Sequence, residues 1–433
     1  MGSKIHHADI KEWAANYDGP LFDGILCDPP YELGFMGKSW DSTGIAFDVD
    51  LWKDLLRICK PGAHLLAFSG SRTYHRMAVA IEDAGFEIRD MIEWVYGSGF
   101  PKSLNIGKAV DKIQGNEREY LGKNPNSRLV KRDKNSAFER PVDTNPAADM
   151  KHLTKGTSEW EGYGTALKPA HEPCVLARKP IEGTVANNVL KHGTGGLAID
   201  NCRVSHSEPQ KTTVRKARSA GWNMENTGFD STKNDTASAN PTGRFPANLI
   251  HDGSDEVEAV FPQTKSQAGV KNLPTSNIYG GNSLLSSKTV GTGEITGYSD
   301  SGSASRFFYT AKASKSERNA GLEDFEDRRA GAMEFRNRES EKGQFEGEPQ
   351  YAKNHHPTVK PLSLTKYLAT LIKPPTGGRL LVPFSGSGSE MIGALQAGWE
   401  YVEGVEITEE YIPIAEARIK YWVEQESKQV VLV

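Results

Sequence analysis

The chain has 433 residues, 37% of them hydrophobic, and a formal net charge of −4. These values predict one large or two medium-sized globular domains and argue against a uniformly basic nucleic-acid-binding protein. The sequence contains no long apolar run and no N-terminal leader pattern, so we expect a cytoplasmic protein without membrane association. Its four cysteines are too few and too scattered for a disulfide framework or a zinc site, and we expect reduced thiols and no metal.

The first 114 residues alternate short apolar strands with helices, which predicts a mostly parallel sheet. The strands are expected at Phe22–Cys27, His64–Phe68 and Met91–Tyr96, and the helices at Val49–Ile58 and Tyr74–Ala84.

Residues 115–350 are rich in Gly, Ser, Thr and Asn and contain few apolar runs, so we expect long loops there. One more regular segment, His171–Arg178, predicts a strand. Two basic stretches, at 121–141 and Lys211–Arg218, make this region the place for contacts with a polyanion. The alternative for the second stretch is an ordinary solvated loop. The candidate DNA-binding residues in it are Lys211, Arg215, Lys216 and Arg218.

From about residue 353 the α/β order returns. The strand Arg379–Phe384 leads into a glycine turn, which is followed by the helix Glu390–Ala397, the strand Tyr401–Ile407 and the amphipathic helix Glu409–Val423.

The glycine turn between a strand and a helix is the layout of a nucleotide site, because glycines allow a sharp turn and close approach of a ligand. Glu406, at the end of the next strand, could accept hydrogen bonds from a ribose diol. Glu390 at the helix start would repel a pyrophosphate, which favours S-adenosylmethionine over a dinucleotide. A flexible Gly/Ser loop is the alternative interpretation. The turn comprises Phe384, Ser385, Gly386, Ser387 and Gly388.

The tetrapeptide Asp28-Pro29-Pro30-Tyr31 follows directly on the strand Phe22–Cys27. Two prolines stiffen the turn and remove N–H donors, so Asp28 and the Pro29 carbonyl become rigid acceptors. Such acceptors suit an exocyclic amino group, and Tyr31 offers a face on which a base can stack. The alternative is an ordinary Asp-Pro turn.

These two motifs, together with His356-Pro357-Thr358-Val359-Lys360-Pro361, resemble the motifs of DNA amino-methyltransferases. Their order, with the catalytic motif first and the cofactor motif last, is that of the permuted β group. The resemblance implies a Rossmann-like, S-adenosylmethionine-dependent α/β sheet. That sheet would be mostly parallel, with one antiparallel edge strand, and would carry a large inserted, loop-rich target-recognition domain.

The resemblance also implies a division of the chain. Residues 1–114 would form the catalytic half and residues 351–433 the cofactor-binding half of the methyltransferase domain. His171–Arg178, within 168–182, would pair with Met91–Tyr96 in a hairpin at the sheet edge, interrupted by an insertion at 115–167. Residues 183–350 would be the target-recognition region, and in this part the chain looks most similar to phage and prophage enzymes.

Site residues are implied as well. Asp28, Pro29, Pro30 and Tyr31 would be catalytic, and Lys102 would lie in a loop that faces DNA. Val382 and Glu390 depart from the family, where Asp and Thr are common. We hypothesise that Lys360 and Thr358 hold the cofactor carboxylate instead. The cofactor residues would be Asp9, Ile10, Asp28, Thr358, Lys360, Pro361, Phe384, Ser385, Gly386, Ser387, Gly388 and Glu406.

The expected activity is methyl transfer from S-adenosylmethionine to the N6 amine of an adenine that is flipped out of double-stranded DNA at a specific site. Asp at the first position of the tetrapeptide is typical of adenine enzymes in this family. The alternatives are a cytosine-N4 enzyme, an RNA or protein amino-methyltransferase, and a catalytically dead DNA-binding relative. A homodimer and a partner restriction nuclease are both compatible with the resemblance.

Overall fold

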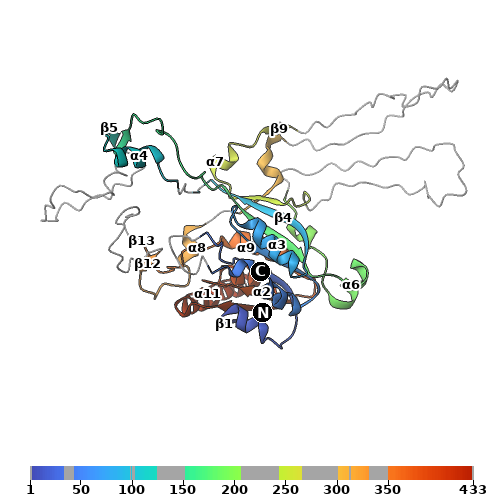
Figure 1. The fold of residues 1–433 in the computed structure, drawn as a ribbon. Helices are drawn as coiled ribbons and strands as arrows, with labels where there is room; N and C mark the ends of the chain where they lie inside the picture. Colours follow the sequence, from blue (N-terminus) through green and yellow to red (C-terminus); the bar gives the residue numbers. More distant parts are fainter. Residues whose placement is uncertain are drawn as a thin grey trace, which may run out of the picture.

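The computed structural model describes residues 2–33, 43–97, 99, 103–123, 152–205, 243–265, 301–311, 314–330 and 350–431. A nine-stranded sheet lies at its centre (Figure 1). In spatial order its strands are β1 (Gly2–His7), β15 (Tyr401–Glu406), β14 (Arg379–Pro383), β2 (Phe22–Cys27), β3 (Cys59–Phe68), β7 (His171–Arg178), β4 (Glu87–Val95), β8 (Leu249–His251) and β11 (Tyr309–Thr310).

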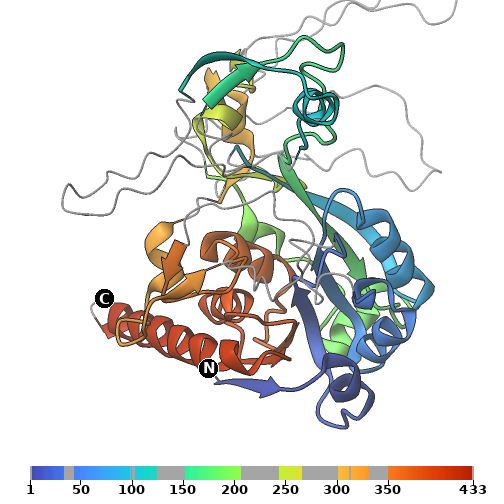
Figure 2. The same cartoon turned by 60° about the vertical axis from the view of Figure 1, so that its left-hand side comes forward.

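The two ends of the chain share this sheet. The C-terminal strands β14 and β15 lie between the N-terminal strands β1 and β2, all four in parallel (Figure 2). Gly2 pairs with Tyr401 and Leu380 pairs with Gly24. The prediction that chain segments far apart in sequence meet in one mostly parallel α/β sheet is therefore confirmed.

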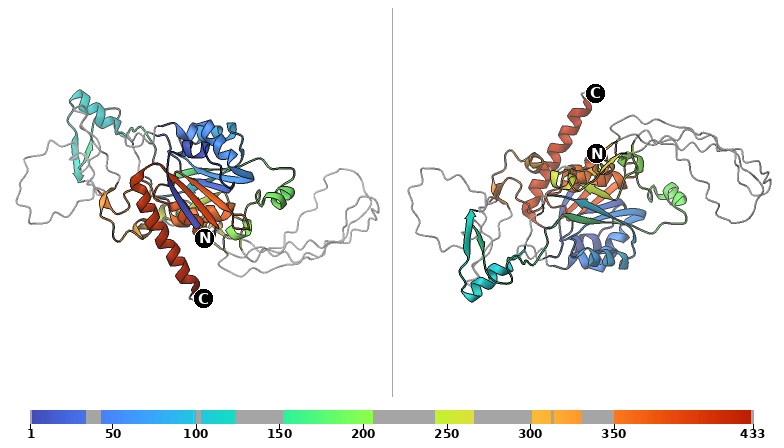
Figure 3. Two further views of the ribbon diagram at one scale, coloured as in Figure 1. Left: turned by 90° about the horizontal axis from the view of Figure 1, so that it is seen from below. Right: turned by 90° about the horizontal axis from the view of Figure 1, so that it is seen from above.

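Helices cover both faces of the sheet (Figure 3). On one side pack α9 (Leu362–Ile372), α10 (Ser389–Gln396) and α11 (Ile412–Val431), and on the other α1 (Ile10–Ala15), α2 (Val49–Arg57) and α3 (Tyr74–Asp83). Because neighbouring strand residues point to opposite faces, Leu26 belongs to the first core and Ile25 to the second. Strand β2 is buried along its whole length because helices cover both of its faces, and its one charged residue, Asp23, pairs with Lys60.

The antiparallel strand is β7. We expected it at the edge of the sheet, but it lies in the interior. It lies between β3 and β4, with Met91 opposite Val175, so the predicted β4–β7 hairpin does form. Beyond β4, however, β8 and β11 extend the sheet in parallel. The free edge of β4 carries unpaired backbone groups, and strands from the middle of the chain satisfy them.

A small unit stands apart from the sheet (Figure 1). It contains α4 (Ile106–Gln114) and the hairpin of β5 (Glu119–Lys123) with β6 (His152–Lys155). Arg118 holds it together through Asp111 and through Glu161 at 2.8 Å. Sequence periodicity did not reveal these elements, which fall in the predicted insertion at 115–167 and just before it.

The predicted domain boundaries stay predictions. No helix in the described ranges is long and apolar enough to cross a membrane.

The remaining helices and strands are short. The short helices are α6 (Val185–His192), α7 (Asp255–Glu258), α8 (Lys315–Asn319), η3 (Ile45–Phe47), η4 (Ile199–Cys202), η5 (Ala304–Phe307) and η6 (Glu409–Tyr411); the short strands are β9 (Gln263–Lys265), β10 (Ser301–Ser303), β12 (Arg328–Ala330) and β13 (Gln350–Ala352).

Candidate active site

The proline turn and the glycine loop lie at the same edge of the sheet. Strands β2 and β14 are hydrogen-bonded neighbours and run parallel, with Ile25 opposite Leu381. The turn Asp28–Tyr31 leaves the carboxyl end of β2, and the loop Phe384–Gly388 leaves the carboxyl end of β14. Ligands of open α/β sheets bind at this edge.

Lys360, in the segment before α9, ties the proline turn together. Its ammonium donates to Asp28 Oδ2 at 2.6 Å and to the Tyr31 hydroxyl at 3.0 Å. It also lies 3.2 Å from Glu172 Oε2. The Tyr31 hydroxyl in turn donates to Glu172 Oε2 at 2.9 Å. Four buried or partly buried side chains from three segments thus form one network, which we call the Lys360 network.

The charge states in this network follow from its geometry. Burial by itself would lower the pKa of Lys360, but Asp28 and Glu172 outweigh it and raise that pKa above the ordinary lysine value. Burial, and then the charges of Asp28 and Glu172, raise the pKa of Tyr31 well above the ordinary value. Lys360 is therefore a cation and Tyr31 a neutral hydrogen-bond donor at neutral pH.

Asp28 has one oxygen engaged and one free. Oδ2 faces Lys360, whereas Oδ1 is buried and has no hydrogen-bond partner among the described residues. A buried acceptor without a donor is costly, so such atoms in a native fold usually await a ligand. The free oxygen supplies one of the two rigid acceptors that the tetrapeptide predicts.

Tyr31 is held through its backbone as well. Its carbonyl accepts from Thr73 Oγ1 at 2.7 Å, which anchors the turn to the segment after β3. The Lys360 ammonium lies 4.7 Å from the centroid of the Phe68 ring, at the end of β3. Tyr31 is thus anchored at its backbone by Thr73 and at its hydroxyl by Glu172 and Lys360.

Glu172 was not singled out from the sequence as a site residue. It lies near the start of β7, and because β7 runs against its neighbours its first residues lie at the edge where β3 ends. In the sequence, the available signal was a carboxylate at the start of the strand predicted to pair with Met91–Tyr96.

The glycine loop adopts conformations that only particular residues accept. Gly386 has φ +50° and Gly388 φ +82°, and Phe384, with φ +60°, is one of two described non-glycine residues with positive φ. The Gly386 N–H donates to Glu406 Oε2 at 2.8 Å. A Cβ atom on Gly386 would lie 2.8 Å from His356 Nε2. Backbone strain and close approach together explain why glycine is needed there.

A buried arginine supports the loop from behind. Arg418 of α11 is fully buried and donates to the Ser387 carbonyl at 2.5 Å, to Ser387 Oγ at 3.0 Å and to Ser389 Oγ at 3.2 Å. Burial lowers the pKa of Arg418 to about 10, so it still carries its charge at neutral pH. In the sequence Arg418 is one charge on an amphipathic helix, and no local signal marks it as buried.

Two other predicted cofactor residues lie beside Glu406. Asp9 caps α1 by accepting from the Lys11 N–H at 2.8 Å, and Ile10 is buried behind it. The Ala8 N–H donates to the Glu406 carbonyl at 3.0 Å, which joins this segment to the end of β15. Asp9, Ile10 and Glu406 therefore lie at one end of neighbouring strands, and their role in cofactor binding stays a prediction.

The other predicted positions are distributed as follows. Pro361 is buried at the start of α9, whereas Thr358 is exposed. Lys360 has three N–H donors, and Asp28, Tyr31 and Glu172 surround it, so its hypothesised contact with a cofactor carboxylate stays a prediction. The described residues contain no group of three or more side chains that could hold a metal ion. Five predicted DNA-binding residues lie outside the described residues: Lys102, Lys211, Arg215, Lys216 and Arg218.

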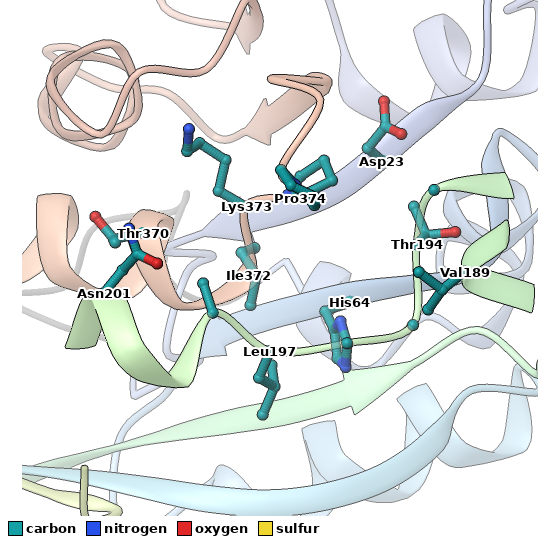
Figure 4. Close-up of a pocket in the computed structure, with 15 residues that line it drawn as sticks. Asp23, His64, Val189, Thr194, Leu197, Asn201, Thr370, Ile372, Lys373 and Pro374 are labelled. Atoms are coloured by element: carbon teal, nitrogen blue, oxygen red, sulfur yellow. The ribbon is translucent and has the colours of Figure 1, made fainter. Parts of the chain in front are cut away.

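A separate cavity of about 370 Å³ lies elsewhere (Figure 4). Asp23, near the start of β2, and His64 of β3 line it together with the loop Gly193–Ala198 and the end of α9. Burial, followed by Arg178 and Arg89, lowers the pKa of His64 to about 4, so the imidazole is neutral. This cavity shares no residue with the proline turn or the glycine loop.

A family model described as DNA methylase matches residues 22–417. The chain therefore belongs to this family of N6- and N4-type DNA methylases. Type II methyltransferase M.HindIII of Haemophilus influenzae is 25% identical over 151 residues, which span 34% of this chain and 37% of the relative.

Solved structures with low similarity include M1.HpyAVI in complex with SAM and the cytosine-N4-specific PvuII DNA methyltransferase. The first is 12% identical with a TM-score of 0.38, covering 96% of this chain and 98% of that chain. The second is 10% identical with a TM-score of 0.40, covering 96% and 86%. The family assignment rests on the family match and not on these two structures.

Proposed function

We propose that this protein transfers a methyl group from S-adenosylmethionine to the exocyclic amine of a base in double-stranded DNA. The observation that carries the proposal is the Asp28 carboxylate at the sheet edge, with Oδ2 fixed by Lys360 and Oδ1 buried without a partner in the described part of the chain. An oriented acceptor with one unused oxygen is what an amino group requires.

The residues around the glycine loop fit a nucleoside cofactor. Ser385 Oγ is another buried atom without a partner among the described residues, and Gly386 and Gly388 have positive φ angles and no side chain, so a ligand can approach the backbone there. The backbone of the loop would contact the cofactor, with Glu406 beside the ribose and Asp9 beside the adenine. When bound, S-adenosylmethionine supplies an electrophilic methyl group with its own leaving group.

The remaining chemistry falls to the protein's side chains. The base must leave the duplex to reach the turn, and Tyr31 would stack on it. Asp28 Oδ1 and the Pro29 carbonyl would accept the two amino hydrogens, which localises the nitrogen lone pair toward the methyl group. Lys360 holds Asp28 in a fixed orientation through its hydrogen bond to Oδ2, and Asp28 can take the proton once the amine is alkylated. Positioning supplies most of the acceleration.

We further propose adenine-N6 as the target, on the resemblance of Asp28-Pro29-Pro30-Tyr31 to adenine enzymes, with cytosine-N4 as the second candidate. We also propose that the protein acts inside the cell, at a specific site in DNA, and that its middle region is of the phage type.

Transfer of tritium from labelled cofactor to unmethylated DNA, RNA and protein, measured in parallel, tests the reaction. We expect label in DNA alone, in N6-methyladenine after hydrolysis of the product. Label in N4-methylcytosine would correct the base, label in RNA or protein would correct the substrate class, and no label with DNA bound would identify an inactive DNA-binding relative.

A further inference from the structure

Glu390 is a buried carboxylate that the proposed mechanism does not use. It stands in the first turn of α10, two residues after Gly388, and is only 5% exposed. Within the described residues its carboxylate forms no ion pair and accepts no side-chain hydrogen bond; of the backbone groups, its own N–H acts on its pKa. Burying a carboxylate without a cation at contact distance is expensive.

Charged groups from both halves of the site act on Glu390. The charged and titratable groups that act on it or respond to it are Asp28 and Cys27 at the end of β2, Lys360 before α9, and Arg418 of α11. Burial, and then the charge of Asp28, raise the pKa of Glu390 to about 7. Glu390 is thus close enough to both halves of the site to interact with each.

The charge of the site is also unbalanced. Asp28, Glu172 and Glu390 are three carboxylates, and Lys360 is the one ammonium that the described residues place among them, with Arg418 behind the glycine loop. An excess of buried negative charge disfavours a phosphate and favours a ligand that brings a positive charge.

From this geometry we infer that Glu390 is the counter-ion for the cationic methionine end of the cofactor, its sulfonium and α-ammonium. The inference rests on the proposed function and adds a specificity: the site binds a cationic nucleoside better than a neutral one of the same shape. Val382 in the preceding strand is apolar and buried, so β14 itself supplies no carboxylate at that position.

Isothermal titration with three ligands tests this on the intact protein. S-adenosylmethionine carries both cations, S-adenosylhomocysteine only the ammonium, and 5′-methylthioadenosine neither. At pH 8 we expect Glu390→Gln to weaken S-adenosylmethionine binding by about tenfold and to leave 5′-methylthioadenosine binding unchanged. A loss for S-adenosylmethionine alone would place the contact at the sulfonium, and a loss for S-adenosylhomocysteine as well would place it at the ammonium. The exposed Glu416→Gln of α11 is the matched control.

The pH dependence gives a second readout. Because the pKa of Glu390 is raised to about 7, its charge is present above that pH and lost below it. Wild-type affinity for S-adenosylmethionine should therefore fall between pH 8 and pH 6, and the Glu390→Gln variant should lack this part of the slope. In the absence of cofactor the variant should unfold at the same or a higher temperature, because an unpaired buried charge has been removed.

Three results would overturn the inference. These are unchanged S-adenosylmethionine affinity and pH slope in Glu390→Gln, an equal loss for 5′-methylthioadenosine, or a lower unfolding temperature without cofactor, since the last two indicate a structural role. Failure of the wild type to bind S-adenosylmethionine at all would instead overturn the proposed function, and this inference with it.

Discussion

The proline turn and the glycine loop meet at one sheet edge, yet they are built in different ways. The turn is held by side chains from distant segments, because Lys360, Glu172 and Thr73 all bond to it. The loop takes its shape from the positive φ angles of its own backbone, and Glu406 and Arg418 hold it from behind. An ion network dominates the turn and backbone conformation sets the loop, so substitutions should affect them differently.

The largest effect should come from the free acceptor of the turn. Asp28→Ala removes the oxygen that is proposed to hold the amine, and we expect methyl transfer to fall at least about 1,000-fold. Cofactor affinity and DNA binding should remain. Single-turnover transfer and titration calorimetry measure the two separately. Full activity in this variant would remove Asp28 from the mechanism and leave the turn a purely structural feature.

Removing the central cation of the turn should have the next largest effect. Lys360→Met leaves Asp28 and Glu172 without their cation, and we expect the rate of transfer to fall about 100-fold. Cofactor affinity should change much less, because the lysine donors face Asp28, Tyr31 and Glu172. Lys366→Met, an exposed lysine on α9, is the control.

The affinity of the Lys360 variant decides a second question. Unchanged cofactor binding would make the hypothesised contact of Lys360 with the cofactor carboxylate wrong. A large loss of affinity with an unchanged rate would instead assign Lys360 to the cofactor half of the site, and the contrast between the two regions would weaken.

The loop should respond to a single methyl group. Gly386→Ala meets both a positive φ of +50° and the imidazole of His356. We expect about tenfold weaker cofactor binding and a loss of roughly 1–2 kcal/mol in the free energy of unfolding. In Gly115→Ala, where φ is +70° and no atom lies within 4 Å of the added carbon, only the strain remains. Equal cofactor affinity in both variants would contradict a role for close approach.

The smallest effect should come from the tyrosine hydroxyl. Tyr31→Phe keeps the ring for stacking but removes the bonds to Glu172 and Lys360, and we expect a three- to tenfold lower rate, about 1 kcal/mol. Tyr31→Leu removes the stacking face as well and should lose more. If both variants lost the same activity, the ring would contribute nothing and the hydroxyl alone would matter.

The contrast also explains what could be predicted. Asp28, Tyr31 and the glycines of the loop are recognisable because their roles depend on residue type and on the element that precedes them. Glu172 and Arg418 could not be predicted as site residues, because their roles depend on which strand lies beside β3 and which helix face lies behind the loop. The interior position of β7 could not be predicted either. It depends on β8 and β11, which extend the sheet beyond β4 and are too short to be placed from the sequence pattern alone.

The sequence by itself determined the alternation of strands and helices, the residues of the two motifs and the order in which they occur. These follow from local periodicity and from side-chain chemistry, which a linear chain already contains. The tertiary structure was needed to show which oxygen of Asp28 is free, that Lys360 links the proline turn to Glu172, and that Glu390 is buried beside the glycine loop. Burial and charge pairing depend on distances between segments hundreds of residues apart, and these distances exist only after the sheet has formed.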